Sequence, residues 1–338
     1  MAVLLAFLLG GMTPRARAAG PATGGGPGAS AAPAASTAPA AAPVDPYAEA
    51  LSQLQSSDAA ARRQGVDTLG RLRKKEAIPA LTKALSDKDA AVRASAANGL
   101  GLLRAASAVP ELSKALAKDG EAGVRQSAAA ALAAIGDPSS TPALIKAVSD
   151  PAPAVRYSAV RTLGSMRAPQ AEAPLVEALK DQDAGMRRAA ASALGLIGSK
   201  TSVAPLSALL ADKDQAVRVE AAKALGLIGD LSAQAALTQS LKDEDGAVRL
   251  QAAQSLARMS VPAGLDVALE ALKDQAPNAR QQAASVIGLI GDEKTGLPAL
   301  DAAYAAEKDP NTKAVIDFTR AQLKARLGLK EKTTAPKQ

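Results

Sequence analysis

The sequence contains no cysteine and no histidine among its 338 residues. Without thiols or imidazoles, it has no disulfides, no thiolate or imidazole metal site, and no Ser-His or Cys-His catalytic pair. The sequence does not exclude acid–base chemistry by an Asp–Glu pair, but the repeat pattern described below accounts for the carboxylates and leaves no convergent pair unexplained. We therefore expect a protein that is not an enzyme, with no catalytic residue, no cofactor and no metal ion.

Aromatic residues are also scarce, and tryptophan is absent. The five that occur are Phe7, Tyr47, Tyr157, Tyr304 and Phe318. Since 48% of the chain is hydrophobic, the core must be built from Ala, Leu, Val and Ile. Alanine is the strongest helix former, so this composition favours closely packed helices.

The positive charge of the chain is unevenly distributed. The formal net charge is +7, but residues 319–338 carry a large share of it. This C-terminal segment contains one acid, Glu331, and six basic residues: Arg320, Lys324, Arg326, Lys330, Lys332 and Lys337. The rest of the chain is close to neutral, so nucleic acid is not the expected partner. Weak polyanion binding through this basic C-terminal segment is kept as a third hypothesis, and residues 328–338 are expected to be disordered.

The N-terminal residues resemble an export signal. Residues 2–12 are apolar but too few to span a bilayer, which takes about 20 residues. Ala16, Arg17 and Ala18 then fit a signal-peptidase site before Ala19, although no Lys or Arg precedes the apolar run. We expect residues 1–18 to be a signal peptide of a periplasmic or secreted protein; the alternative is a disordered cytoplasmic N-terminus. Residues 19–45, rich in Ala, Pro and Gly, are expected to form a flexible linker.

From Pro46 onward the sequence repeats itself, and an arginine marks the register. The interval between successive marker arginines is 31 residues, and once 32. They are Arg62, Arg93, Arg125, Arg156, Arg187, Arg218, Arg249 and Arg280, with Lys313 in a ninth, divergent copy. A fixed period of this length is typical of stacked helical repeats.

Within each repeat the apolar residues follow a helical period. With the arginine numbered zero, apolar residues recur at −1, +3, +7 and +10, which places them on one helix face. Glycines at +11 (Gly136, Gly198, Gly229 and Gly291) suit left-handed C-terminal caps. Glycines also recur at +8 inside the helix, where each costs about 1 kcal/mol relative to Ala. We interpret them as sites of close approach by a neighbouring helix.

The consensus Asp-x-Asp-x-x-Val-Arg-x-x-Ala-Ala-x-Ala-Leu-Gly-x-Ile-Gly is clearest in residues 181–198 and 212–229. It resembles the short HEAT repeat of the phycobilisome-lyase type, in the armadillo-like superfamily. The resemblance implies an all-α fold, a right-handed α-solenoid of about nine antiparallel helix pairs over residues 46–327. It further implies that the arginine-bearing helices line the concave side. The last pair, with Tyr304, Val315, Phe318 and Leu323 supplying bulk, is expected to close the array.

The resemblance also implies a structural ladder between turn aspartates and helix arginines that runs from repeat to repeat. The pairs six residues apart are Asp87/Arg93, Asp119/Arg125, Asp150/Arg156, Asp181/Arg187, Asp212/Arg218, Asp243/Arg249 and Asp274/Arg280, whereas the first repeat has Ser56 instead of an aspartate. The alternative function for these arginines is a phosphate-binding row; we favour internal pairing with carboxylates. Aspartates at −4, such as Asp58 and Asp214, are expected to be helix N-caps.

Binding residues are expected at the variable positions opposite the apolar stripe, namely +1 and +5. The predicted partner-binding residues are Tyr157, Arg161, Arg188, Val219, Lys223 and Leu250. An aromatic residue, cations and exposed aliphatics together are typical of an interaction hot spot. The alternative is an ordinary solvated helix face with a few apolar residues.

These features favour a non-catalytic scaffold, expected to be a monomer without a membrane span, that binds a protein partner on its concave face. The second hypothesis is an accessory or lyase-like chaperone subunit acting on a chromophore-bearing or modified protein. Two enzyme classes with HEAT-like folds fit poorly. The diiron hydroxylases need paired His-Glu motifs, and the DNA glycosylases rely on aromatic contacts that this sequence does not supply.

Overall fold

The structure is a computed structural model that describes residues 45–329. Those residues contain eighteen α-helices and no β-strand. The described residues all belong to one compact unit. The proposed signal peptide, nearly all of the proposed linker and residues 330–338 lie outside the described residues.

The helices alternate between a first and a longer second helix, in nine pairs over the described residues. The first helices are α1 (Pro46–Gln53), α3 (Ile78–Ala84), α5 (Val109–Lys118), α7 (Thr141–Ala147), α9 (Glu172–Ala178), α11 (Val203–Ala208), α13 (Gln234–Ser240), α15 (Leu265–Ala271) and α17 (Gly296–Ala306). The second helices are α2 (Ala59–Leu72), α4 (Ala90–Leu102), α6 (Ala122–Ile135), α8 (Pro153–Ser165), α10 (Ala184–Ile197), α12 (Gln215–Ile228), α14 (Gly246–Arg258), α16 (Pro277–Ile290) and α18 (Pro310–Arg326). Short 3₁₀ turns occur at Lys75–Ala77, Ala106–Ala108, Pro138–Ser140, Pro169–Ala171, Lys200–Ser202, Leu209–Ala211, Leu231–Ala233 and Pro262–Gly264.

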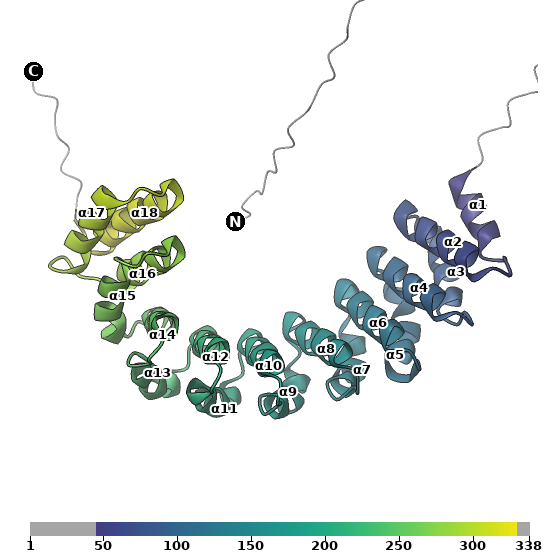
Figure 1. The fold of residues 1–338 in the computed structure, drawn as a ribbon, viewed down its shortest axis with the longest axis horizontal. Helices are drawn as coiled ribbons and strands as arrows, with labels where there is room; N and C mark the ends of the chain where they lie inside the picture. Colours follow the sequence, from purple (N-terminus) through teal and green to yellow (C-terminus); the bar gives the residue numbers. More distant parts are fainter. Residues whose placement is uncertain (1–44, 330–338) are drawn as a thin grey trace, which may run out of the picture. The chain divides into compact units, whose positions relative to one another are not determined.

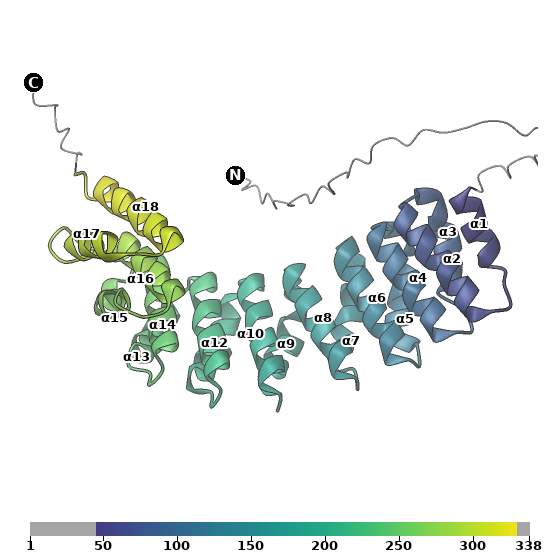
Figure 2. The same cartoon turned by 45° about the horizontal axis from the view of Figure 1, so that its top comes forward.

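The pairs follow one another in a curved row (Figures 1 and 2). Each second helix packs against the second helices before and after it, so α10 contacts α8 and α12. In Figure 1 the second helices line the inner side of the curve, and α3 to α13 of the first helices lie outside them. The predicted all-α solenoid of nine helix pairs, with the arginine-bearing helices on the concave side, is confirmed.

Aspartates begin most of the second helices, as predicted. The Asp58 side chain accepts hydrogen bonds from the backbone N–H groups of Ala60 and Ala61, and Asp214 accepts one from Val217 at 3.1 Å. Asp89, Asp183 and Asp245 cap their helices in the same way. These carboxylates satisfy amide groups that have no partner within the helix.

The C-terminal caps follow the prediction at three of four glycines. Gly136, Gly198 and Gly229 have φ between 69° and 78°, the left-handed conformation that glycine adopts without strain. Gly291 is the exception, because its φ is −65° and the chain continues there in extended conformation. In the repeats without a glycine at +11, the same left-handed turn is made by Arg73, Arg104, Arg167 and Ser260.

The core consists of small aliphatic side chains, and glycine at +8 lets the second helices approach closely. A Cβ atom added at Gly164 would lie 2.7 Å from the Cα of Ala193, and one at Gly195 would lie 2.8 Å from the Cα of Ala224. The interpretation of these glycines as helix contact points is therefore confirmed. The leucine at +7, such as Leu194, is fully buried beside each contact.

The last pair differs from the prediction in one residue. Leu323 is buried and Tyr304 lies beneath the cations of Lys313 and Arg320, but Phe318 is 70% exposed. Phe318 stands at +5 of its repeat, on the outward face, so it does not help to close the core. Arg320 is paired with Asp301 and so belongs to the folded array, not to a free basic tail.

Candidate functional site

The arginine ladder joins neighbouring repeats and not residues of one repeat. Arg187 shows the pattern: Nε donates to Asp212 Oδ2 at 2.7 Å and Nη2 to Asp212 Oδ1 at 2.7 Å. Its third nitrogen, Nη1, donates to the backbone carbonyl of Asp181 at 2.9 Å. The aspartate six residues before each arginine thus contributes its carbonyl, and the carboxylate comes from the next repeat. The predicted ladder does run from repeat to repeat. Pairing of each arginine with the carboxylate six residues before it is wrong, because that aspartate offers only its carbonyl to the arginine.

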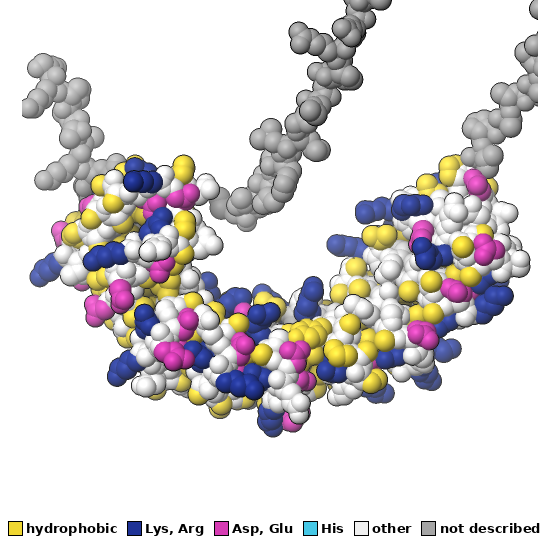
Figure 3. Space-filling model, viewed as in Figure 1, with side chains coloured by type: hydrophobic (Ala, Val, Ile, Leu, Met, Phe, Trp, Pro, Cys, Tyr) yellow, Lys and Arg dark blue, Asp and Glu magenta, His cyan; other side chains and the backbone are white. Residues whose placement is uncertain are grey.

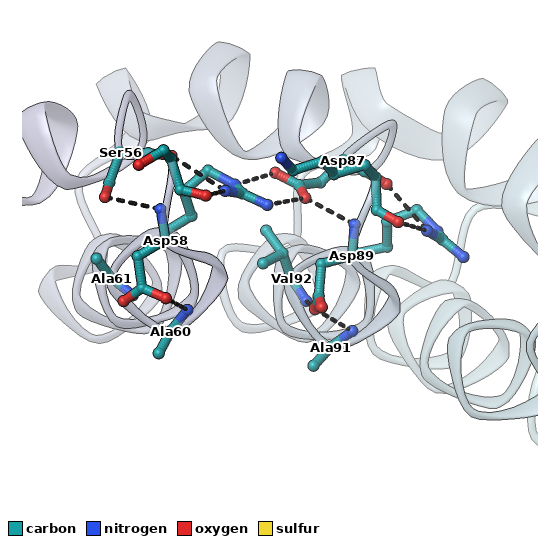
Figure 4. Close-up of polar contacts among 12 residues, drawn as sticks. Ser56, Asp58, Ala60, Ala61, Asp87, Asp89, Ala91 and Val92 are labelled. Atoms are coloured by element: carbon teal, nitrogen blue, oxygen red, sulfur yellow. Dashed lines mark hydrogen bonds and ion pairs between the residues drawn. The ribbon is translucent and has the colours of Figure 1, made fainter.

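Six arginines form complete rungs in the described residues. The pairs are Arg62–Asp87, Arg93–Asp119, Arg125–Asp150, Arg187–Asp212, Arg218–Asp243 and Arg280–Glu307. Figure 4 shows the first repeats, where the carbonyl of Ser56 replaces that of an aspartate. Hydrogen bonds from the arginines lower the pKa values of Asp87, Asp119, Asp150 and Asp212 below the usual range, and that of Glu307 to about 2. Because these guanidinium forks are already occupied, they offer no ready phosphate-binding row.

The ladder has two gaps within the described residues. Arg156 and Arg249 still donate Nη1 to backbone carbonyls of their own repeats, but neither is paired with a carboxylate. The Nε atom of Arg156 is buried and has no hydrogen-bond partner. The junction between α8 and α10 therefore lacks the connection found at most other junctions.

Tyr157 bridges the same junction in place of the missing rung. Its hydroxyl donates to Asp183 Oδ2 at 2.7 Å, which joins α8 to the N-cap of α10. Burial, and then this hydrogen bond to an anion, raise the pKa of Tyr157 to about 12. The hydroxyl is therefore protonated at neutral pH, and its ring is held in one position.

A groove of about 640 Å³ opens beside Tyr157 on the inner face. It is lined by residues of α6, α8, α10 and α12: alanines and serines form much of its wall, and Glu220 stands at one end. Arg161 and Arg188 also line the groove; both are exposed, and neither forms an ion pair in the part of the chain that the structure describes. In Figure 3, hydrophobic side chains gather near the middle of the array, with Lys and Arg side chains beside them.

The other three predicted binding residues lie elsewhere. Val219 is half-buried and is not among the residues that line the groove, and Lys223 is paired with Glu220 at 3.1 Å. Leu250 is only 4% exposed and belongs to the core of the C-terminal repeats, so its prediction as an outward-facing contact is wrong. A helical projection treats each helix as isolated, whereas packing at the α14–α16 junction covers this position.

Sequence reasoning missed Leu196, which is 39% exposed and lines the groove. It stands at +9 in its repeat, beside +5 on the outward face of the helix. Exposed leucines occupy the same position in three other second helices: Leu102, Leu227 and Leu289. This recurrence is visible in the sequence and places exposed apolar side chains on the inner side of the array, interrupted by polar residues at the same position in other repeats, such as Ser165 and Arg258.

Neither a metal site nor a membrane span is found in residues 45–329. No group of three or more Asp and Glu residues there is placed to hold a metal ion. None of the helices in that range is long and apolar enough to cross a bilayer.

The sequence matches the family described as HEAT repeats in four overlapping segments, residues 47–133, 109–194, 172–249 and 235–317. These segments cover most of the chain, which therefore belongs to the HEAT-repeat family. Curated proteins give no match to this sequence.

Solved structures of similar fold include the Escherichia coli protein YibA, with 24% sequence identity and a TM-score of 0.54 over 80% of this chain and 99% of that one. An engineered protein is 22% identical, with a TM-score of 0.51 over 83% of this chain and 89% of that one. The complex of CpcE and CpcF of phycocyanin lyase from a Nostoc species is 26% identical, with a TM-score of 0.42 over 75% and 100% of the two chains. The first two likenesses show the fold alone, and the third is too low to add to that.

Proposed function

We propose that this protein is a non-catalytic scaffold whose inner-face groove between α8 and α10 holds a segment of a partner protein. One observation carries the proposal. The groove combines an alanine-rich wall, a fixed tyrosine and two arginines that form no ion pair within the described residues. Tyrosine and arginine are the residue types over-represented where protein interfaces gain most of their binding energy.

The rigidity of the groove supports binding of a partner segment. Tyr157 is held by its hydrogen bond to Asp183, and the walls are helices packed through glycine contacts at Gly164 and Gly195. A preformed surface loses little conformational entropy on binding. The groove lies on an open helical face instead of inside an enclosed cavity, which suits an elongated segment.

Site-specific photocrosslinking in the native host tests this proposal. A photoreactive, apolar amino acid replaces Leu196, which lines the groove and is exposed, and in a matched control it replaces Lys146, which is exposed on α7 of the outer row. We expect an adduct of one discrete mass from position 196 and none from position 146. No adduct at 196, or the same set of adducts at both positions, would contradict a binding groove.

We further propose that the scaffold acts in the periplasm or outside the cell. The support lies in residues 1–18, which have the apolar run and the small residues of a cleavable export signal. N-terminal sequencing of the protein from its native source should give Ala19 as the first residue. An intact N-terminus in the cytoplasmic fraction would contradict export.

A further inference from the structure

We infer that the groove recognises an acidic, extended peptide segment with two carboxylates three or four residues apart and small apolar residues between them. This inference rests on the proposed function and adds the chemistry of the partner to it. It is carried by the charge that remains unpaired in the groove and by the geometry of the two helices that bear that charge.

The groove has a net positive charge. Of the acids near it, Glu220 is paired with Lys223 at 3.1 Å. Asp183 remains an anion, but its oxygens accept hydrogen bonds from the Tyr157 hydroxyl and a backbone N–H group and form no ion pair with an arginine of the groove. Arg161 and Arg188, which both line the groove, therefore outnumber its one unpaired acid, and neither forms an ion pair among the described residues. A guanidinium fork binds a carboxylate through two parallel hydrogen bonds, so a partner with two acidic side chains is complementary to this pair.

The positions of the two arginines set the spacing of those acids. Arg161 stands at +5 on α8 and Arg188 at +1 on α10. Adjacent packed helices lie about 8–10 Å apart, and four residues along a helix add about 6 Å. The two guanidinium groups are therefore roughly 10–12 Å apart if their side chains extend alike. In a β-strand, side chains on one face that are four positions apart lie about 13 Å apart, because successive side chains alternate. In the polyproline II conformation, which has three residues per turn, side chains three positions apart share a face and lie about 9 Å apart. The matching carboxylates are therefore three positions apart in a polyproline II segment or four in a strand.

The wall of the groove is built mostly of small side chains. Ala189 and Ala193 line it from α10 among several serines, and Leu196 adds a larger apolar side chain. Small side chains leave room for short aliphatic groups of a bound peptide, and burial of these groups contributes to binding in proportion to their area. A highly charged segment without apolar residues would leave this wall uncovered.

Fluorescence anisotropy with the full chain and designed peptides tests the inference. The main probe is a labelled twelve-residue Gly/Ser peptide, blocked at both ends, with the central sequence Asp-Ala-Leu-Asp. One comparison peptide has both acids replaced by asparagine, and another has the two aspartates adjacent. We expect the main probe to bind at least about tenfold more tightly than the asparagine peptide, and the adjacent pair to fall between them.

Protein variants assign that preference to the groove. The double variant R161Q/R188Q should bind the main probe and the asparagine peptide equally. The matched control R104Q/R167Q removes the same charge from exposed arginines in left-handed turns outside the groove, and it should keep the tenfold preference.

The inference would be wrong if the acidic probe did not bind, if the asparagine peptide bound equally well, or if the spacing of the two acids made no difference to the affinity. Loss of the preference in both double variants would also overturn it, because that result would indicate general charge attraction. Tighter binding of a twelve-nucleotide single-stranded DNA would also do so, in favour of a nucleic-acid partner. If photocrosslinking at position 196 succeeds while the acidic probe fails, the scaffold function stands and only the acidic partner is rejected.

Discussion

Each ladder arginine connects three parts of the array with one side chain. Arg187, only 6% exposed, donates to the carboxylate of the next repeat and to backbone carbonyls at Asp181 and Gln182 that the turn leaves without helix partners. Hydrogen bonds to charged groups contribute more than neutral ones, and an unpaired buried partner costs more than the bond itself. Replacement of such an arginine therefore leaves several groups unsatisfied at once.

The complete and incomplete rungs give a direct comparison. Arg187→Met should lower the free energy of unfolding by about 3 kcal/mol, the range for breaking a buried ion pair from one side. Arg156→Met, which removes a marker arginine without a carboxylate partner, should lower it by clearly less. Urea denaturation followed by circular dichroism measures both. Equal losses would show that the carboxylate adds little to the carbonyl contacts.

The ladder aspartates predict a defined acid sensitivity. The hydrogen bond from Arg187 lowers the pKa of Asp212 below its ordinary value of 3.8, and the same holds for Asp87, Asp119 and Asp150. A depressed folded-state pKa contributes stability that is fully present above the unfolded value and is lost as the pH falls through the folded value. Protonation of the ladder aspartates should therefore have little effect on the urea midpoint above about pH 5. Below about pH 4 the urea midpoint should fall steeply, because these aspartates then become protonated.

The neutral variant Asp212→Asn tests the source of that sensitivity. It should be less stable than the wild type at pH 7. It should also lose less stability between pH 5 and pH 2, because it lacks one carboxylate whose protonation is coupled to unfolding. Asp266→Asn, at an exposed position of α15, should keep the wild-type pH dependence. An unchanged slope in the Asp212 variant would refute ladder control of acid unfolding.

At the scale of the helix, the glycine at +8 lowers the helix propensity of its own segment but allows closer packing against the neighbouring helix. Gly164 and Gly195 each leave room for the backbone of the following second helix. The cost of about 1 kcal/mol per glycine is offset by the packing of the adjacent leucines at van der Waals distance. The recurrence of this glycine follows from the recurrence of the contact.

Two alanine substitutions separate these effects. Gly195→Ala should destabilise the protein by about 1–2 kcal/mol net, since overpacking costs about 1–3 kcal/mol and the gain in helix propensity recovers part of it. Gly123→Ala, on α6 with nothing within 4 Å of the added methyl group, should stabilise it slightly. Melting temperatures measure both. A rise for both variants would disprove close helix approach at Gly195.

At the scale of the array, the ladder gaps coincide with two changes along the row. The gap at Arg156 lies beside the groove, where Tyr157 provides a different connection between repeats. The gap at Arg249 lies where one continuous core cluster gives way to a second, which contains Leu250 and Leu323. Because stacked repeats contact only their neighbours, a weaker junction affects the array locally.

Helix α18 is the last helix of the array in the described residues, and it packs on α16 and α17. Ile316 and Leu323 of α18 are buried against α16, and Glu307 completes the last rung. Truncation at Asp309 should therefore expose Ile287 and its neighbours, lower the melting temperature and cause aggregation. Truncation after Leu329 should leave both properties unchanged. Light scattering and thermal melts compare them, and equal solubility of the two truncations would argue against a capping role.

The sequence predicts the local features well because they depend on residues close together along the chain. The 31-residue period, the N-cap at Asp214, the left-handed cap at Gly198 and the close approach at Gly195 all follow from propensity and spacing. Tyr157 was singled out for its place on the outward helix face, and it does line the groove. The caps depend on one helix alone, and the close approach at Gly195 follows from the recurrence of glycine at one position of most second helices.

Which side chains meet across a junction between repeats does not follow from the spacing alone. The chain determined by itself that helix pairs form, where they begin and end, and that their apolar faces need neighbours. Only the stacking of those pairs decided that Arg187 reaches Asp212 in the next repeat, that Arg156 lacks a carboxylate, and that Leu250 is covered while Phe318 is not. The physical reason is range: helix propensity and capping act over a few residues, whereas rungs, gaps and grooves depend on the rotation of each pair against the next.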